Sequence, residues 1–118
     1  MNVNFDAPKP EIKVFYAKDC VPEKVVLQIL LGIEEEGVLF TVEEKPTKVA
    51  TKLAVKAAEA SHLGVGIGIC ESAVIHYIKL KEGEPLFRVS VNSDEETLRS
   101  LGSNAARLVK RMPFKELG

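Results

Sequence analysis

Three consecutive glutamates, Glu34, Glu35 and Glu36, close a segment whose pattern predicts an amphipathic helix. The C-terminus of a helix carries the negative pole of the macrodipole, so each carboxylate there costs about 0.3–1 kcal/mol unless a positive charge offsets it. No lysine or arginine occupies the last turn of this segment. The compensating charge must therefore come from outside the segment, from a distant part of the chain, a partner protein or a bound metal ion.

The spacing of the apolar residues indicates which glutamate faces outward. The stripe predicted to be buried follows the i, i+3, i+4, i+7 pattern of a helix and consists of Val26, Ile29, Leu30 and Ile33. Because successive helical residues turn by about 100°, Glu34 and Glu36 flank this stripe and Glu35 points away from it. Leu31 shares the outward side with Glu35, and an exposed leucine beside such a carboxylate is typical of an interaction surface. An ordinary solvated face is the alternative that the residues alone leave open.

The other reactive side chains form no recognisable catalytic or metal-binding set. Cys20 and Cys70 are far apart in the sequence and outside any C-x-x-C pattern, so we expect two free thiols. His62 and His76 are isolated, without further ligands at a spacing typical of zinc. Because no Ser/His/Asp or Cys/His arrangement can be assembled from local spacing, we predict no catalytic residue in this chain.

The glycines of Gly64-Val65-Gly66-Ile67-Gly68 invite comparison with a phosphate-binding loop. Such loops follow a strand and open a helix, whereas these glycines precede and enter a predicted strand. The lysine and serine or threonine of a P-loop are also missing. The run therefore indicates a tightly packed central strand, and a small flavodoxin-like ligand-binding domain is an alternative that has only this run as support.

The elements that position these residues follow a simple order along the chain. Residues 1–10, with two prolines, are predicted to form a loose lead-in. The patterns then predict strands at 12–16, 39–44, 66–70, 73–80 and 86–91, and helices at 22–36, 48–61 and from a capping box at Ser93 and Glu96 to Pro113. This order predicts an α/β fold, a three-layer sandwich with a mixed, mostly parallel sheet of about five strands.

Size and charge narrow the classes of protein further. The 118 residues fit one domain, residues 1–118. The 16 basic and 17 acidic residues give a net charge of −1, and the scattered basic residues argue against a nucleic-acid partner. No apolar run approaches about 18 residues, and no charged-then-apolar leader follows Met1, so we expect no membrane span, no secretory signal and a cytoplasmic location.

A second distinctive segment is Ser103-Asn104-Ala105-Ala106-Arg107-Leu108-Val109-Lys110, followed by Pro113-Phe114. We expect Gly102 to loosen the helix at this point and Asn104 to cap it or contact a neighbouring loop. The basic residues near the end of the helix have the sign that the dipole favours. Taken alone, the segment predicts only structure.

Together, two motifs closely resemble the small subunit of the diol and glycerol dehydratase reactivating factors. They are Leu30-Leu31-Gly32-Ile33-Glu34-Glu35-Glu36-Gly37 and Asn104 to Lys110 with Pro113-Phe114. Chain length and motif order agree along essentially the whole chain, and the strands at 66–70 and 74–77 agree less specifically. The family often has proline where this chain has Leu39. The resemblance implies a fold similar to the dehydratase medium (beta) subunit and to anticodon-binding-domain-like folds.

The function that the resemblance implies is that of a chaperone-like subunit and not of an enzyme. In this family a large ATP-hydrolysing subunit and the small subunit release damaged cobalamin from inactivated adenosylcobalamin-dependent dehydratase by subunit swapping. The implied partners are the large subunit, in a heterotetramer of two large and two small subunits, and the dehydratase as client. ATP and ADP would bind only through the large subunit, and the complex would work in the cytoplasm, free or associated with a bacterial microcompartment.

The resemblance also assigns roles to the glutamates. It implies that Glu35 helps to hold an interfacial Mg²⁺ shared with the large subunit, and that Leu31, Glu34, Glu35 and Glu36 belong to the partner interface. A hard cation such as Mg²⁺ binds carboxylate oxygens and would neutralise the charge at the helix end. The alternative within the same fold is a subunit of a cobalamin-dependent dehydratase itself, but such subunits carry additional sequence.

Overall fold

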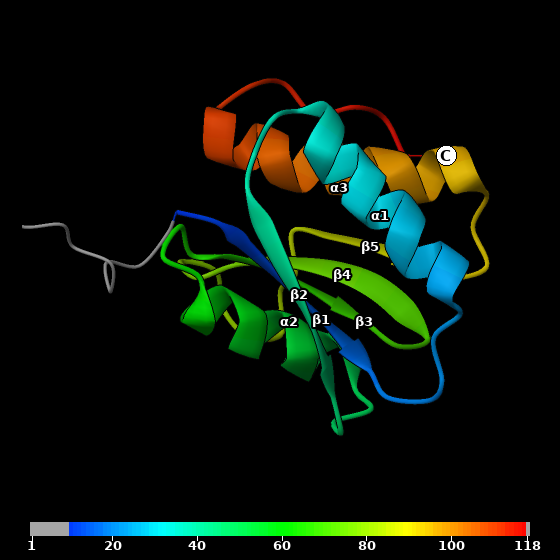
Figure 1. The fold of residues 1–118 in the computed structure, drawn as a ribbon. Coiled ribbons are helices and arrows are strands. Elements are labelled where there is room, and N and C mark those ends of the chain that lie inside the picture. The colour runs from blue at the N-terminus through cyan, green and yellow to red at the C-terminus, as the bar shows by residue number, and fades with distance from the viewer. Residues whose placement is uncertain (1–9, 118) are drawn as a thin grey trace, which may run out of the picture.

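A computed structural model of the chain describes residues 10–117, so that the predicted lead-in lies almost entirely outside the described residues. Helices α1 and α3 cover one face of a five-stranded sheet and α2 covers the other (Figure 1). The elements are β1 (Ile12–Ala17), α1 (Glu23–Glu35), β2 (Phe40–Lys45), α2 (Ala50–Ala60), β3 (Val65–Ile69), β4 (Ser72–Tyr77), β5 (Phe87–Ser90) and α3 (Glu95–Lys110). The predicted α/β sandwich of three layers is confirmed.

The strand order in the sheet is β2-β1-β3-β4-β5. β1 pairs in parallel with β2 and β3, whereas the β3–β4 and β4–β5 pairs are antiparallel. The connection from β1 to β2 passes over one face through α1, and the connection from β2 to β3 passes over the other through α2 (Figure 1). The carboxyl ends of β1 and β3 therefore emerge side by side, at the place where an α/β sheet changes its winding direction.

The glycines of β3 serve helix packing. All five residues of β3 are buried, and β3 is the middle strand of the sheet. A Cβ atom on Gly66 would overlap the backbone of Ala57 and Ala58, and one on Gly68 would overlap the backbone at Ala54. The prediction of a tightly packed central strand is confirmed, because bare backbone on the strand and alanines on α2 let the two elements lie close together.

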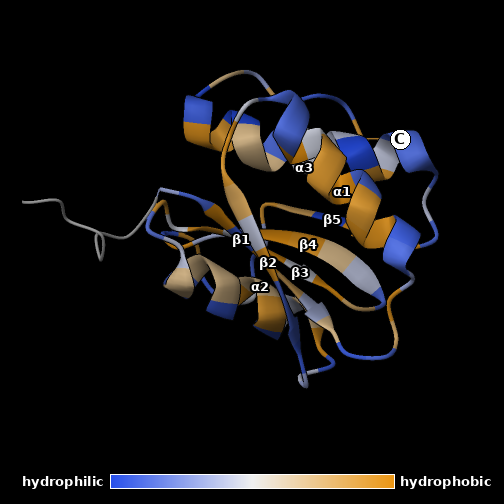
Figure 2. Cartoon of the chain, viewed as in Figure 1, coloured by the Kyte–Doolittle hydropathy of each residue, from blue (hydrophilic) through white to orange (hydrophobic). Residues whose placement is uncertain are grey.

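The main core lies between the sheet and the pair α1 and α3. Fully buried members include Val14, Ile29, Ile33, Ile67 and Leu101, and the apolar sides of both helices turn toward the sheet (Figure 2). Each such side chain contributes about 1.5–3 kcal/mol through its removal from water.

Among the described residues, none of the helices combines the length and apolarity needed to cross a membrane.

Helices α1 and α3 run parallel and in contact. Three hydrogen-bonded pairs join them, each separated by 71 residues in sequence and each four residues further along both helices than the one before. The pairs are Arg99 Nη2 to Gln28 Oε1 at 2.6 Å, Ser103 Oγ to the Gly32 carbonyl oxygen at 3.2 Å, and Arg107 Nε to Glu36 Oε2 at 3.0 Å. We call this row of contacts the α1–α3 seam.

Two glycines make the seam possible. A Cβ atom on Gly32 would overlap the carbonyl oxygen of Arg99, and one on Gly102 would overlap the carbonyl oxygen of Ile29. Gly102 lies within the unbroken helix α3, and the structure shows a packing role for it that the sequence did not predict. Its missing side chain leaves the room that the backbone of α1 occupies.

Both ends of α3 follow ordinary capping chemistry, and the N-cap lies one residue later than predicted. Asp94, and not Ser93, is the N-cap, and its carboxylate accepts a hydrogen bond of 2.7 Å from the Thr97 N–H. This hydrogen bond lowers the pKa of Asp94. At the other end Arg111 adopts a left-handed conformation with φ of 58°, and the helix stops before Pro113 as predicted.

We predict that Gly102→Ala lowers the free energy of unfolding by about 1–3 kcal/mol, because the added methyl group forces the α1–α3 seam apart. Gly83→Ala is the matched control, since nothing lies within 4 Å of a Cβ atom there. Its effect should stay within about 0.5 kcal/mol. Urea unfolding followed by circular dichroism measures both, and equal midpoints for the two variants would contradict the packing argument.

Candidate functional site

The three glutamates at the end of α1 have different surroundings. Glu34 is exposed, the Glu35 side chain is 48% exposed, and the Glu36 side chain is only 10% exposed. The helix ends at Glu35, and Gly37 follows the C-cap with a φ of 74° that suits glycine. Glu35 thus faces outward, as its place opposite the apolar stripe predicts.

Glu36 is held by the end of α3. Its carboxylate accepts hydrogen bonds from Arg107 Nε at 3.0 Å and from Lys110 Nζ at 3.1 Å, and Lys110 Nζ also donates to the Glu36 carbonyl oxygen at 2.8 Å. Burial by itself would raise the pKa of Glu36, but these cationic donors outweigh it and hold the pKa below its ordinary value. For Glu36, therefore, the compensating charge comes from a distant part of the same chain.

Glu35 receives much weaker compensation. The nearest cationic atom is Arg99 Nη1, 3.8 Å from Glu35 Oε2. Arg99 is already engaged, because its Nε and Nη2 donate to Gln28 Oε1 at 3.1 and 2.6 Å. An exposed ion pair of this kind contributes about 0–1 kcal/mol. The carboxylate of Glu35 is therefore free to bind another donor or a cation.

A polar hollow of about 670 Å³ adjoins Glu35. Its lining carries four carboxylates and two cationic groups, and consists of Glu35, Glu95, Glu96, Arg99, Ser100, Lys115 and Glu116. Within residues 10–117 no group of three or more His, Cys, Asp or Glu side chains is arranged to hold a metal ion. A Mg²⁺ bound at Glu35 would therefore take most of its ligands from water or from another chain.

The second sequence motif positions part of the lining of this hollow. Asn104 is fully buried, its Nδ2 donates to the Lys115 carbonyl oxygen at 2.9 Å, and its Oδ1 accepts from the Lys115 N–H at 2.7 Å. Phe114 also packs edge-to-face on Phe87, with 5.0 Å between the ring centroids. The predicted contact of Asn104 with a neighbouring loop is confirmed, and this contact places Lys115 and Glu116 at the hollow beside Glu35.

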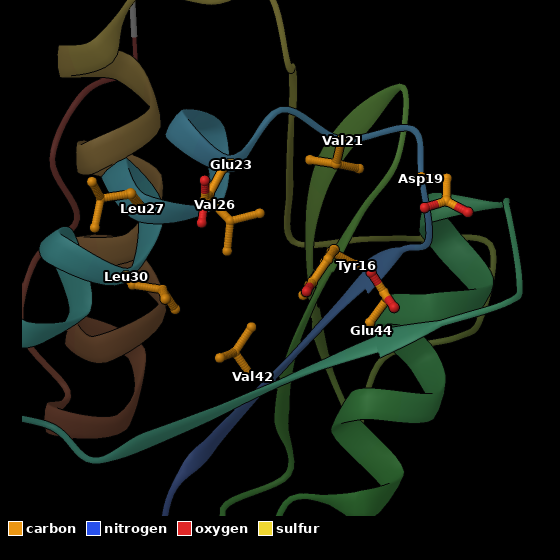
Figure 3. Close-up of a pocket in the computed structure, with 9 residues that line it drawn as sticks. All are labelled: Tyr16, Asp19, Val21, Glu23, Val26, Leu27, Leu30, Val42 and Glu44. Atoms are coloured by element: carbon orange, nitrogen blue, oxygen red, sulfur yellow. The ribbon is translucent and has the colours of Figure 1, made fainter.

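The most exposed leucine of α1 is not Leu31, the residue that the sequence predicted to face outward. Leu31 is partly covered, whereas Leu27, one turn earlier, is 52% exposed. Leu27 lies at a second hollow, an apolar groove of about 470 Å³ between α1 and β2 with carboxylates along its border (Figure 3). The groove is lined by Tyr16, Asp19, Val21, Glu23, Val26, Leu27, Leu30, Val42 and Glu44. The sequence did not single out this groove, because only the pairing of β2 with β1 brings Val42 opposite α1.

We predict that Glu36→Gln lowers the free energy of unfolding by about 1–3 kcal/mol at neutral pH, because it removes the charged acceptor of two cationic donors. The folded-state pKa of Glu36 lies below its ordinary value of 4.5. The stabilising contribution is therefore complete above that value and is lost as the pH falls through the folded-state pKa. The difference between wild type and variant should shrink over the same range.

The control for this experiment is Glu34→Gln. Glu34 is exposed and makes no ion pair with any described residue, so this change should cost less than about 0.5 kcal/mol. Urea titrations at neutral pH and at a series of lower pH values give the comparison. A pH-independent difference between wild type and Glu36→Gln would show that the charge is not what matters.

Comparison with known proteins gives consistent results along nearly the whole chain. The family described as dehydratase medium subunit matches residues 9–115. The propanediol dehydratase-reactivating factor small subunit of Citrobacter freundii is 44% identical over 108 residues, 91% of each chain. The protein of the same name from Salmonella typhimurium is 40% identical over 119 residues, 99% of this chain and 98% of that one.

A solved structure agrees with these sequence comparisons. It is the structure of diol dehydratase-reactivating factor complexed with ADP and Mg²⁺, in which a chain 37% identical to this one superimposes with a TM-score of 0.85. The match covers 92% of this chain and 99% of that chain. With fold and sequence in agreement over nearly its whole length, the chain belongs to the family of dehydratase-reactivating factor small subunits, within the wider family of dehydratase medium subunits.

Proposed function

We propose that this chain is the non-catalytic small subunit of a reactivating factor, which releases damaged cobalamin from inactivated adenosylcobalamin-dependent diol or glycerol dehydratase. Relatives named as such small subunits match almost all of the chain. The match to the dehydratase medium subunit family supports the mechanism of subunit swapping, because two subunits with the same fold can compete for one surface. The factor works in the cytoplasm, free or associated with a bacterial microcompartment.

The partner in this proposal is a large ATP-hydrolysing subunit, in a heterotetramer of two large and two small subunits. The similar solved structure is of a whole reactivating factor complexed with ADP and Mg²⁺. In this chain the glycines of β3, which invited comparison with a phosphate loop, are packed against α2. We therefore assign nucleotide binding and hydrolysis to the large subunit.

The contact with the large subunit centres on Glu35, with Leu31, Glu34 and Glu36 around it. The observation that carries this assignment is that Glu35 is exposed and its nearest cation, Arg99 at 3.8 Å, is already bound by Gln28. Glu35 fits a hard cation as a single ligand, and Mg²⁺ supplies charge that offsets the negative helix end. Glu36 has an indirect role. Its ion pairs with α3 fix the end of α1 and hence the direction of Glu35.

We predict that Glu35→Gln weakens binding to the large subunit at least about tenfold, or 1.4 kcal/mol, when Mg²⁺ and nucleotide are present. The isolated variant should unfold like wild type, because Glu35 is exposed. Glu59→Gln on α2 is the matched control, since it removes an exposed carboxylate on the opposite layer and should leave affinity unchanged. Isothermal titration calorimetry gives the dissociation constants, and full affinity of Glu35→Gln would refute the assignment.

A second candidate function is a subunit of the dehydratase itself, because the chain also matches the dehydratase medium subunit family. The two candidates differ in what they bind. We expect a pull-down from cells growing on glycerol or 1,2-propanediol to recover the ATP-hydrolysing subunit. Recovery of the catalytic dehydratase subunit without that ATPase would establish the second candidate instead.

A further inference from the structure

The two cysteines meet at the carboxyl ends of β1 and β3. Both are free, as predicted, but their Sγ atoms lie only 3.8 Å apart although 50 residues separate them in sequence. The sheet explains this proximity. β1 and β3 are parallel neighbours, so the turns that follow them emerge at the same edge, with Cys20 in the turn after β1 and Cys70 directly after β3.

The geometry at this edge allows the two sulfur atoms to approach further. A disulfide bond of about 2.05 Å requires the Sγ atoms to close by about 1.8 Å. Cys20 is exposed and follows Asp19, a residue with a left-handed φ of 63°. Because both cysteines lie just beyond the paired residues of their strands, a small movement of the turn closes this distance without breaking the β1–β3 ladder.

We propose that Cys20 and Cys70 form a reversible intramolecular disulfide when the chain meets a peroxide. The Cys20 thiol first releases its proton, and the thiolate attacks a peroxide oxygen to give a sulfenic acid. The O–O bond breaks, and the departing hydroxide takes up that proton and leaves as the first water. The sulfur of Cys70 then displaces the hydroxyl from Cys20, the S–S bond forms, and the second water leaves. Two thiols together lose two hydrogen atoms, and hydrogen peroxide is reduced to two waters.

The surroundings divide the roles between the two thiols. Cys20 is exposed and can meet a peroxide directly. Cys70 is partly covered and donates to the Lys48 carbonyl oxygen at 3.4 Å. Burial, with smaller effects of Cys20 and Glu71, raises the pKa of Cys70 to about 11, which keeps Cys70 in the thiol form. Cys20 is therefore the peroxidatic residue and Cys70 the resolving one.

The disulfide would change a second feature of the molecule. The turn that carries Cys20 also carries Asp19 and Val21, which line the groove between α1 and β2 (Figure 3). Drawing Cys20 toward the end of β3 moves these residues together with it. Oxidation thus reshapes one border of the groove, and this consequence does not rest on the function proposed above.

The test treats the purified full-length chain with hydrogen peroxide and then counts free thiols by maleimide labelling and intact mass. We expect a monomer that has lost both thiols, is lighter by two hydrogen atoms, yields joined peptides of Cys20 and Cys70, and recovers both thiols with dithiothreitol. Persistence of both thiols, separate sulfinic acids, or disulfides only between two chains would each overturn the proposal.

Single variants and an unfolded control test the geometry. With dimedone as the trap, Cys70→Ser should give labelled sulfenic acid at Cys20, and Cys20→Ser should give markedly less label at Cys70. Equal or reversed labelling would overturn the assigned roles. In concentrated urea the intramolecular link should form at least about tenfold more slowly, because a long loop must then close at random. An unchanged rate would show that the folded chain does not bring the thiols together.

Discussion

The parallel contact of α1 with α3 is the constraint on which the site depends. Parallel helices bring their negative poles to the same end, which is unfavourable without cations nearby. Arg107 and Lys110 lie at that end, and both bind Glu36. Gly32 and Gly102 allow the backbones to approach closely enough for these side chains to reach across the seam. The two glycines and the two cations therefore work together, since neither pair alone would stabilise this arrangement.

The seam also separates the roles of neighbouring glutamates. Its contacts recur every four residues on α1, so position 36 must face the end of α3. Position 35 is rotated by about 100° from it and faces outward. A single helix end thus provides one carboxylate that holds the chain together and another that is available to a cation. Without the seam all three carboxylates would be solvated alike, and the direction of Glu35 would not be fixed.

Local patterns were sufficient to predict the order of the elements, the three layers, the packed glycines of β3 and the outward direction of Glu35. Each of these follows from periodicity within a segment or from the order of the segments along the chain. The pairing of Glu36 with Arg107, the role of Gly102 and the approach of Cys20 to Cys70 could not be predicted in this way. They depend on which strands become neighbours and how closely two helices pack, and these properties link segments 50 to 73 residues apart.

The two hollows flanking α1 would give a partner different kinds of binding energy. The groove at Leu27 combines apolar side chains, which contribute by burial, with the carboxylates of Asp19, Glu23 and Glu44 at its border. The polar hollow at Glu35 is lined by charged side chains, so its contribution would change with any cation that binds there. Subunit swapping, as proposed here, requires an interface that forms and separates again. The proposed contact centred on Glu35 would meet this requirement, because its strength would change with a cation bound at that exposed carboxylate.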